Sequence, residues 1–136
     1  MNNKRMKELY GDFKNALERL ARALKEDINK NETAVDGTIQ RFEFTFELAW
    51  KLESAILSYN GVEVGIPRMV IKEAFKAGLL KDGAAWIEML EDRNKTSHIY
   101  DEDMAQEIYN KIKNSHFKIL EDFRQSVEDF IKSSGI

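Results

Sequence analysis

The sequence predicts an all-α protein, an up-and-down antiparallel helical bundle with three long helices and two short connecting helices. Apolar residues recur at intervals of three and four along most of the chain, which is the period of an amphipathic helix. No segment alternates apolar and polar side chains between turn residues, so we expect no sheet. The 136 residues, 43% of them hydrophobic, suit one domain over residues 1–136 with a single core.

The first two long helices are expected on either side of a polar break at residues 29–32. Apolar residues at helical spacing predict one helix over about 4–28 and another over about 35–58. Asn60 and Gly61 then supply a helix stop signal. At about 1.5 Å per residue, each helix is long enough to cross a small domain.

Two short helices should follow as connectors. Pro67, the only proline, fits the first turn of a helix over 68–76 that stops at Gly78. Asp82 and Gly83 precede a second short helix over about 84–92.

The last helix is predicted to begin at Asp101, whose side chain can cap the first turn. Glu102 and Asp103 then lie where acidic groups favour the positive end of the helix dipole. The apolar pattern continues without a break to residues 133–135, so we expect one continuous helix.

Composition excludes several kinds of chemistry. The chain has no cysteine, which removes disulfides, a thiolate nucleophile and any cysteine-based zinc site. Its two histidines are far apart in sequence, so we expect neither a metal nor another cofactor. No apolar run approaches the roughly 20 residues that span a bilayer, and the expected location is cytoplasmic.

The formal net charge of −3 means that a nucleic-acid ligand would need a local basic cleft. Arg68, Lys72 and Lys76, together with Arg93 and Lys95, are the candidates. The first three are spaced by four residues, however, and this spacing also suits the solvated face of an ordinary amphipathic helix. Both interpretations remain open from the sequence.

A short polar segment brings together a cation, an amide and an imidazole. It reads Arg93-Asn94-Lys95-Thr96-Ser97-His98. In a continuous helix Arg93 and His98 would lie about 140° apart around the axis and could not converge on one atom. The residues between them favour turns, so we predict a helix end near Arg93 and a polar loop that lets both side chains face one cleft.

Such a pair could cleave a phosphodiester without metal. An imidazole with a pKa near ~6.5 can take or give the proton of a ribose hydroxyl or a leaving oxygen. The Arg93 guanidinium can bind the phosphorane charge through two N–H groups while His98 moves the proton. The alternative is structural: Arg93 pairs with Asp92, Glu91 or a helix C-terminus, and His98 caps or packs.

Three sequence blocks resemble one known family. They are residues 41–53 (RFEFTFELAWKLE), Ile66-Pro67-Arg68 leading to 71–75 (IKEAF), and 86–100 (WIEMLEDRNKTSHIY). Together these blocks are similar to the nucleotidyltransferase substrate-binding proteins, a branch of the HEPN superfamily of helical domains. The pattern R-x4-H-x-Y is weak by itself, but it is specific in register with the other two blocks.

The resemblance implies a HEPN-like bundle that pairs with a minimal nucleotidyltransferase in a toxin–antitoxin-like module. It also implies a homodimer in which the R-x4-H motifs face each other, and metal-independent cleavage of RNA. Arg93 and His98 match the catalytic pair, Asn94 the supporting polar residue, and Tyr100 a tyrosine that the partner can modify with AMP. Two alternatives remain: a non-catalytic accessory subunit that binds substrate or nucleotide for the transferase, and a structural dimer with a relict motif.

Other conspicuous side chains have structural interpretations. Phe42 and Phe46, four residues apart, should lie in the core, whereas Phe44 is off that face and is a candidate for a dimer or partner surface. Trp50 and Trp86 should be packing anchors.

Two further carboxylates and the second histidine are also expected to be structural. Glu43 and Glu47 share a helix face and should be solvated, with Lys51 as the partner of Glu47. His116 has apolar neighbours at four-residue spacing and should pack at the edge of the core.

Overall fold

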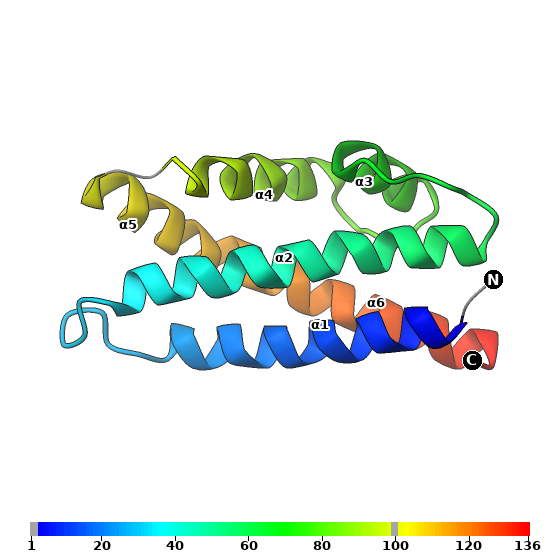
Figure 1. Ribbon diagram of the computed structural model, residues 1–136, viewed down its shortest axis with the longest axis horizontal. Coiled ribbons are helices and arrows are strands. Elements are labelled where there is room, and N and C mark those ends of the chain that lie inside the picture. Colours follow the sequence, from blue (N-terminus) through cyan, green and yellow to red (C-terminus); the bar gives the residue numbers. More distant parts are fainter. Residues whose placement is uncertain (1–2, 99–100) are drawn as a thin grey trace.

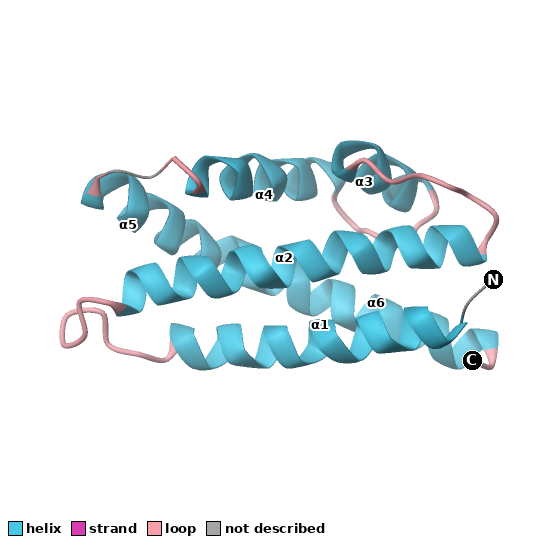
Figure 2. Ribbon diagram, viewed as in Figure 1, coloured by secondary structure: helices cyan, strands magenta, loops and turns pink. Residues whose placement is uncertain are grey.

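The computed structural model describes residues 3–98 and 101–136, and within these ranges it is helical, with no strand (Figures 1 and 2). The elements are α1 (Asn3–Leu24), α2 (Ala34–Tyr59), α3 (Pro67–Lys76), α4 (Gly83–Thr96), α5 (Glu102–Lys111), the π-helix η1 (Ile112–His116) and α6 (Phe117–Ser134). The predicted all-α class is therefore confirmed. None of these helices combines the length and the apolar character needed to cross a membrane.

The chain runs back and forth along the long axis of the molecule (Figure 1). α1 and α2 lie antiparallel and pack extensively on each other, and α4 returns along α2 on its other side. The continuous run of α5, η1 and α6 forms the third long element and ends beside the start of α1. This is the predicted up-and-down bundle, in which α3 and α4 are the two short helices.

A single hydrophobic core fills the space between these elements. At its centre are the aromatic rings of Phe42, Phe46, Trp86 and Phe123, with ring centroids 6.2 Å, 6.0 Å and 5.2 Å apart in that order. The predictions for Phe42, Phe46 and Trp86 are confirmed because all three are buried. Trp50 is only half-buried.

The first helix ends four residues earlier than its apolar pattern suggests, at Leu24. The reason is local hydrogen bonding. The Asp27 side chain accepts a hydrogen bond from the backbone N–H of Asn29 at 2.9 Å, and the Asp27 carbonyl accepts from Lys30 and Asn31 at 3.1 Å. These turn bonds replace the helical bonds that would have carried α1 further.

Helix α4 extends further than predicted, to Thr96, so the expected helix end near Arg93 is wrong. The turn-forming side chains bond backward to the helix backbone and not outward into a loop. Thr96 Oγ1 lies 2.6 Å from the Arg93 carbonyl oxygen, and Ser97 Oγ donates to the Asn94 carbonyl at 3.1 Å. Serine and threonine can make such bonds without leaving the helix.

The last long helix starts as predicted and runs without a gap, but it is not α-helical throughout. Asp101 caps it, and its Oδ1 accepts from the backbone N–H of Met104 at 2.8 Å. Between α5 and α6 lies the π-helical turn η1, which closes with a bond from the Phe117 N–H to the Ile112 carbonyl. Because a π turn holds one extra residue, it shifts the side chains that follow around the axis.

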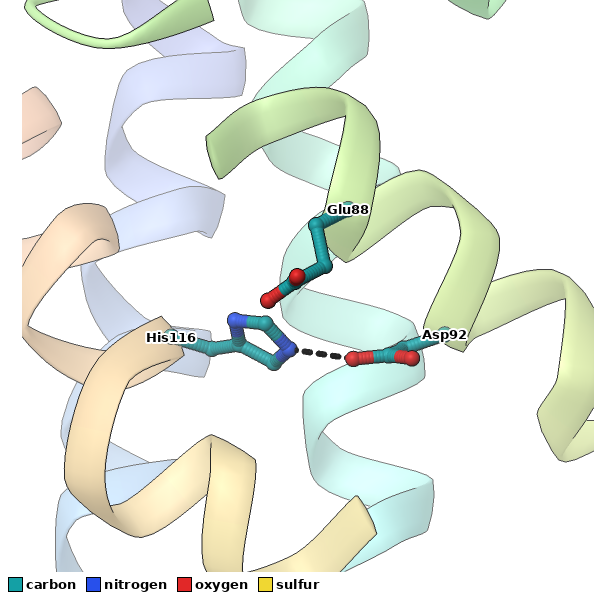
Figure 3. A group of neighbouring side chains, drawn as sticks. All are labelled: Glu88, Asp92 and His116. Carbon is teal, nitrogen blue, oxygen red and sulfur yellow. Dashed lines mark hydrogen bonds and ion pairs between the residues drawn. The ribbon is translucent and has the colours of Figure 1, made fainter. Parts of the chain in front are cut away.

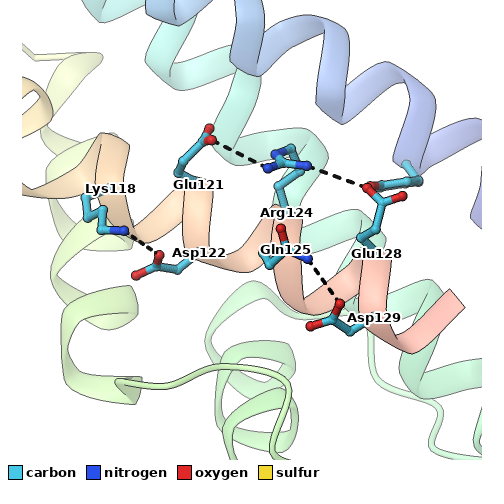
Figure 4. A network of polar contacts seen from close by, with 8 residues as sticks. Lys118, Glu121, Asp122, Arg124, Gln125, Glu128 and Asp129 are labelled. Atoms are coloured by element: carbon cyan, nitrogen blue, oxygen red, sulfur yellow. Dashed lines mark hydrogen bonds and ion pairs between the residues drawn. The ribbon is translucent and has the colours of Figure 1, made fainter. Parts of the chain in front are cut away.

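The outer face of α6 is polar and is tied to α1. Arg124 lies between Glu121 and Glu128 at 3.6 Å from each, as Figure 4 shows. Glu128 also accepts a hydrogen bond of 2.9 Å from the Tyr10 hydroxyl, which joins the two helices. Burial and this bond to Glu128 raise the pKa of Tyr10 to about 12.

Candidate active site

A cleft of about 270 Å³ opens where α2, the start of α3 and the second half of α4 meet. Its lining residues are Phe46, Glu47, Trp50, Ile66, Pro67, Arg68, Leu90, Arg93 and Asn94. One wall is apolar, and two guanidinium groups, an amide and a carboxylate lie around it. This combination suits a ligand with a flat apolar part and an anionic part.

Arg93 is fixed in this cleft by an ion pair between two helices. Its Nη2 donates to Glu47 Oε2 at 2.9 Å, and both side chains are partly buried. Glu47 Oε1 also lies 3.8 Å from Lys51. Glu47 therefore has the expected lysine partner, but its closer partner is Arg93. A guanidinium has five N–H donors, so most of those on Arg93 remain available for a phosphate.

A second bond joins the same two helices one turn further along. Thr96 Oγ1 lies 2.7 Å from Glu43 Oε2 and 2.6 Å from the Arg93 carbonyl oxygen. A hydroxyl has one proton, so it donates to one of these two acceptors at a time. Glu43 and Glu47 were expected to be solvated, but both hold the last turns of α4 against α2.

His98 lies two residues past the end of α4 and is exposed. Its backbone N–H donates to the Lys95 carbonyl at 2.9 Å, which continues the helical turn. In the described part of the chain no hydrogen bond or ion pair joins His98 to Arg93. Asn94 is exposed beside the cleft, and Tyr100 lies outside the described residues.

A polar cluster joins α4 to η1, and its centre is buried (Figure 3). His116 Nε2 is 2.6 Å from Asp92 Oδ2, and both side chains are almost fully buried. Lys111 Nζ lies 2.8 Å from the same Asp92 oxygen. His116 also stacks on Phe42, with 5.4 Å between ring centroids. His116 is thus more deeply buried than a residue at the core edge, and its polar role was not expected.

The protonation of His116 follows from its surroundings. Burial lowers the pKa of His116, although the bond to Asp92 acts in the opposite direction. A carboxylate can only accept, so Nε2 carries the proton and donates it to Asp92. His116 Nδ1 is buried and has no partner within residues 3–98 and 101–136, so an N–H there would be an unpaired donor. The neutral ring with the proton on Nε2 fits both facts.

The same cluster raises the question of a metal. Glu88, Asp92 and His116 have ligand atoms within 4.8 Å of one another. Lys111 lies among them, because its Nζ is 3.6 Å from Glu88 and 2.8 Å from Asp92. The Lys111 ammonium thus supplies, next to the Glu88 and Asp92 carboxylates, the positive charge that a metal ion would otherwise provide.

Sequence reasoning missed Asp92 as a buried residue. The available signal was its position three residues after Met89, which places it toward the buried side of α4. The partners of Arg93 had no such signal, since Glu47 is 46 positions away.

Comparisons with known proteins agree on one family. Residues 8–129 match the family model described as nucleotidyltransferase substrate binding protein like. A curated relative, the "Probable ribonuclease HepT" of Haemophilus influenzae, is 33% identical over 86 residues. The matched stretch is 60% of this chain and 59% of that protein, less than two thirds of the relative's length.

A solved structure has the same fold. The crystal structure of a protein from Thermus thermophilus superposes with a TM-score of 0.69 at 32% identity. The match covers 89% of this chain and 97% of the other.

Proposed function

Since this chain belongs to the nucleotidyltransferase substrate binding protein like family, we propose that it is the HEPN-type subunit of a cytoplasmic toxin–antitoxin-like module. In that module it pairs with a minimal nucleotidyltransferase and cuts RNA without a metal ion. The observation that carries the proposal is the position of Arg93. Its guanidinium is fixed by Glu47 in a cleft that Asn94 also lines, on the helix that leads directly to the exposed His98.

The cleavage step needs both motif residues. His98 takes the proton of a ribose 2′-hydroxyl, and the 2′-oxygen then bonds to the adjacent phosphorus. The bond between phosphorus and the 5′-oxygen breaks, and a proton from an imidazolium or water goes to that oxygen. The products are a 2′,3′-cyclic phosphate and a 5′-hydroxyl. Arg93 stabilises the charge on the phosphorane oxygens, and the Asn94 amide donates to the same phosphate.

The active unit is a homodimer. Within one chain Arg93 is held by Glu47 on α2, whereas His98 is exposed past the end of α4. A second copy that brings its own motif opposite the first supplies Arg93 and His98 from both chains to one shared cleft. An exposed His98 can reach across such an interface.

Tyr100 is the proposed point of control. The nucleotidyltransferase joins the tyrosine oxygen to the α-phosphorus of ATP, and pyrophosphate leaves. The new AMP group adds a negative charge two residues from His98, where it competes with RNA phosphate for Arg93. Mass spectrometry after co-expression with the transferase tests this. An unmodified Tyr100 in a neutralised complex would contradict it.

The test of the main proposal is growth after induced expression of this chain alone, with RNA integrity measured in the same cells. Wild type should arrest growth and cleave RNA, whereas His98→Ala should do neither. Ser97→Ala is the matched control, because Ser97 is the exposed neighbour of His98 and should remain toxic. Healthy growth and intact RNA with folded wild-type protein would refute the ribonuclease activity.

One observation favours a second function, that of a non-catalytic accessory subunit. The cleft beside Trp50 is about 270 Å³ in volume and pairs an apolar wall with arginine side chains, which fits a single nucleotide. Nucleotide binding that persists in His98→Ala, without any RNA cleavage by wild type, would favour this accessory role for the transferase.

A further inference from the structure

Helix α3 presents a row of positive charge on its outer face. Val70, Ile71 and Ala74 are buried against the bundle. On the opposite side, Arg68, Lys72 and Lys76 are all exposed. Their spacing of four residues puts successive cations about 6 Å apart along the helix. We call these three residues the α3 row.

The α3 row is largely free of intramolecular partners. Within the described ranges, Arg68 and Lys72 make no hydrogen bond or ion pair. Lys76 has one weak partner, Glu73, at 3.5 Å. An ordinary solvated helix face usually mixes both signs of charge, but α3 carries three cations and one carboxylate in a chain of net charge −3.

The row runs between two hollows, each lined by part of α3. Arg68 lines the cleft that contains Arg93 and Asn94. Lys72 and Lys76 line a second, shallow hollow of about 540 Å³ that also includes Lys81 and the half-exposed ring of Phe75. The row therefore leads away from the proposed catalytic arginine, and an aromatic surface lies beside its far end.

We propose that the α3 row binds the backbone of the single-stranded RNA substrate on one side of the scissile bond. Successive phosphates pair with Arg68, Lys72 and Lys76, and Phe75 offers a flat surface for a base. This inference rests on the proposed ribonuclease function and adds the direction in which the substrate strand leaves the cleft. The row supplies affinity without sequence preference, because phosphate contacts do not read bases.

The charges that face the row do not oppose this role. Glu73 lies on α3 itself and is partly occupied by Lys76. Asp82 borders the second hollow, but its side chain accepts the hydrogen bond that caps α4, from the Ala85 N–H at 3.1 Å. Glu47 borders the cleft and is paired with Arg93.

The test measures binding of a short single-stranded RNA to the full chain carrying His98→Ala, so that the RNA stays intact. In this background the triple change Arg68→Gln, Lys72→Gln and Lys76→Gln should weaken binding about tenfold or more at ~50 mM salt. The plot of the logarithm of the association constant against the logarithm of salt concentration should also become less steep by about 2, because three phosphate contacts are lost. Circular dichroism and thermal melting verify that each variant is folded.

Two control sets separate the row from charge in general. Lys7→Gln, Lys25→Gln and Lys30→Gln remove the same charge from exposed positions on α1 and the loop after it, and should leave the affinity nearly unchanged. A second set, Arg68→Lys, Lys72→Arg and Lys76→Arg, keeps the charge and should keep the affinity and the salt slope.

The outcomes distinguish this inference from the function on which it rests. If wild type cuts RNA but the α3 triple variant binds like the control set, only the α3 row is refuted. If wild type neither binds nor cuts RNA, the ribonuclease function fails and the inference fails with it. If the triple variant binds RNA normally but no longer co-purifies with the nucleotidyltransferase, the row belongs to a protein interface and the inference is overturned.

Discussion

Asp92 and His116 form a buried hydrogen bond of 2.6 Å between α4 and the π turn η1. Asp92 immediately precedes Arg93, so this bond fixes the backbone from which the proposed catalytic arginine projects. π turns often occur at functional sites, and here the turn carries the histidine that meets Asp92. We therefore propose that Asp92 and His116 position Arg93 through α4.

The buried histidine predicts a loss of stability in mild acid. Its pKa is lowered by burial in the folded state, so the unfolded chain binds the proton more readily. Stability is therefore fully present above the unfolded value of about 6.5 and falls as the pH drops below it. Urea unfolding between about pH 5 and pH 8 measures the effect, taken as the difference between wild type and His116→Gln.

The difference in unfolding free energy between wild type and His116→Gln should shrink toward pH 5, because glutamine has no proton to take up at this position. The matched control is His98→Ala, which removes the exposed histidine and should keep the wild-type loss in acid. An equal loss in His116→Gln would assign the effect to other groups.

The buried Glu53 should change stability with pH in the opposite direction to His116. Its side chain is fully buried, neither carboxylate oxygen has a hydrogen-bond partner among the described residues, and burial raises its pKa well above the ordinary value. The folded state keeps the proton that the unfolded state releases near pH ~4.5, so this group lowers stability as the pH rises above that value. Glu53→Leu should remove this slope and stabilise the protein at pH ~8 by about 1–3 kcal/mol.

Glu53→Gln separates ionisation from polarity, since the amide cannot ionise but still lacks a partner. We expect it to flatten the slope and to give only part of the gain. A Glu53→Leu variant that is less stable than wild type at high pH would show that the carboxyl has an unrecognised partner.

The ion pair between Glu47 and Arg93 predicts a change in activity with little change in stability. The two side chains are 31% and 39% exposed, so the pair should contribute less than about 1 kcal/mol to folding. Glu47→Gln frees the guanidinium to leave the cleft, and RNA cleavage should fall by about tenfold. Arg93→Gln should abolish cleavage, and Arg93→Lys should not restore it, because lysine lacks the planar fork.

Lys51→Gln is the control, because Lys51 is the other partner of Glu47 and lies 3.8 Å from it. It should cleave RNA like wild type. If Glu47→Gln retained full activity, Glu47 would have no positioning role for Arg93.

Thr96 should hold the last turn of α4 in place and thereby the position of His98. Thr96→Val keeps the side-chain shape but removes the hydroxyl that can donate to either Glu43 or the Arg93 carbonyl. Stability should fall by about 1 kcal/mol, and amide hydrogen exchange at His98 should become faster as the last turn frays. Cleavage should decrease through kcat, with KM nearly unchanged.

Ser97→Ala removes a bond of 3.1 Å within the same turn and tests whether any lost hydroxyl has this effect. It should change exchange and cleavage less, because it leaves the bond to α2 intact. Equal effects of the two variants would refute a specific role for Glu43.

Several features of this protein could be read from its sequence because they depend on local patterns. The period of apolar residues gave the helical class and the approximate position of each helix, and it placed Phe42 and Phe46 in the core. Asp101 was correctly identified as a cap, because capping involves a donor three residues away. The motif blocks indicated the family, since they depend only on residue identity and order.

The predicted helix ends and the partners of the polar residues needed the tertiary structure. α4 continues past Arg93 because Thr96 can bond to Glu43 on α2, and a propensity for turns does not include that partner. The pairing of Asp92 with His116 likewise depends on how η1 packs against α4.

The sequence by itself therefore determined the helical class, the approximate position of each helix and which residues could take part in chemistry. Only the tertiary structure decided which of those residues meet. The physical reason is range: helix periodicity and capping act over three or four residues, whereas Glu47 and Arg93 are 46 residues apart and meet only because the core packs α2 against α4.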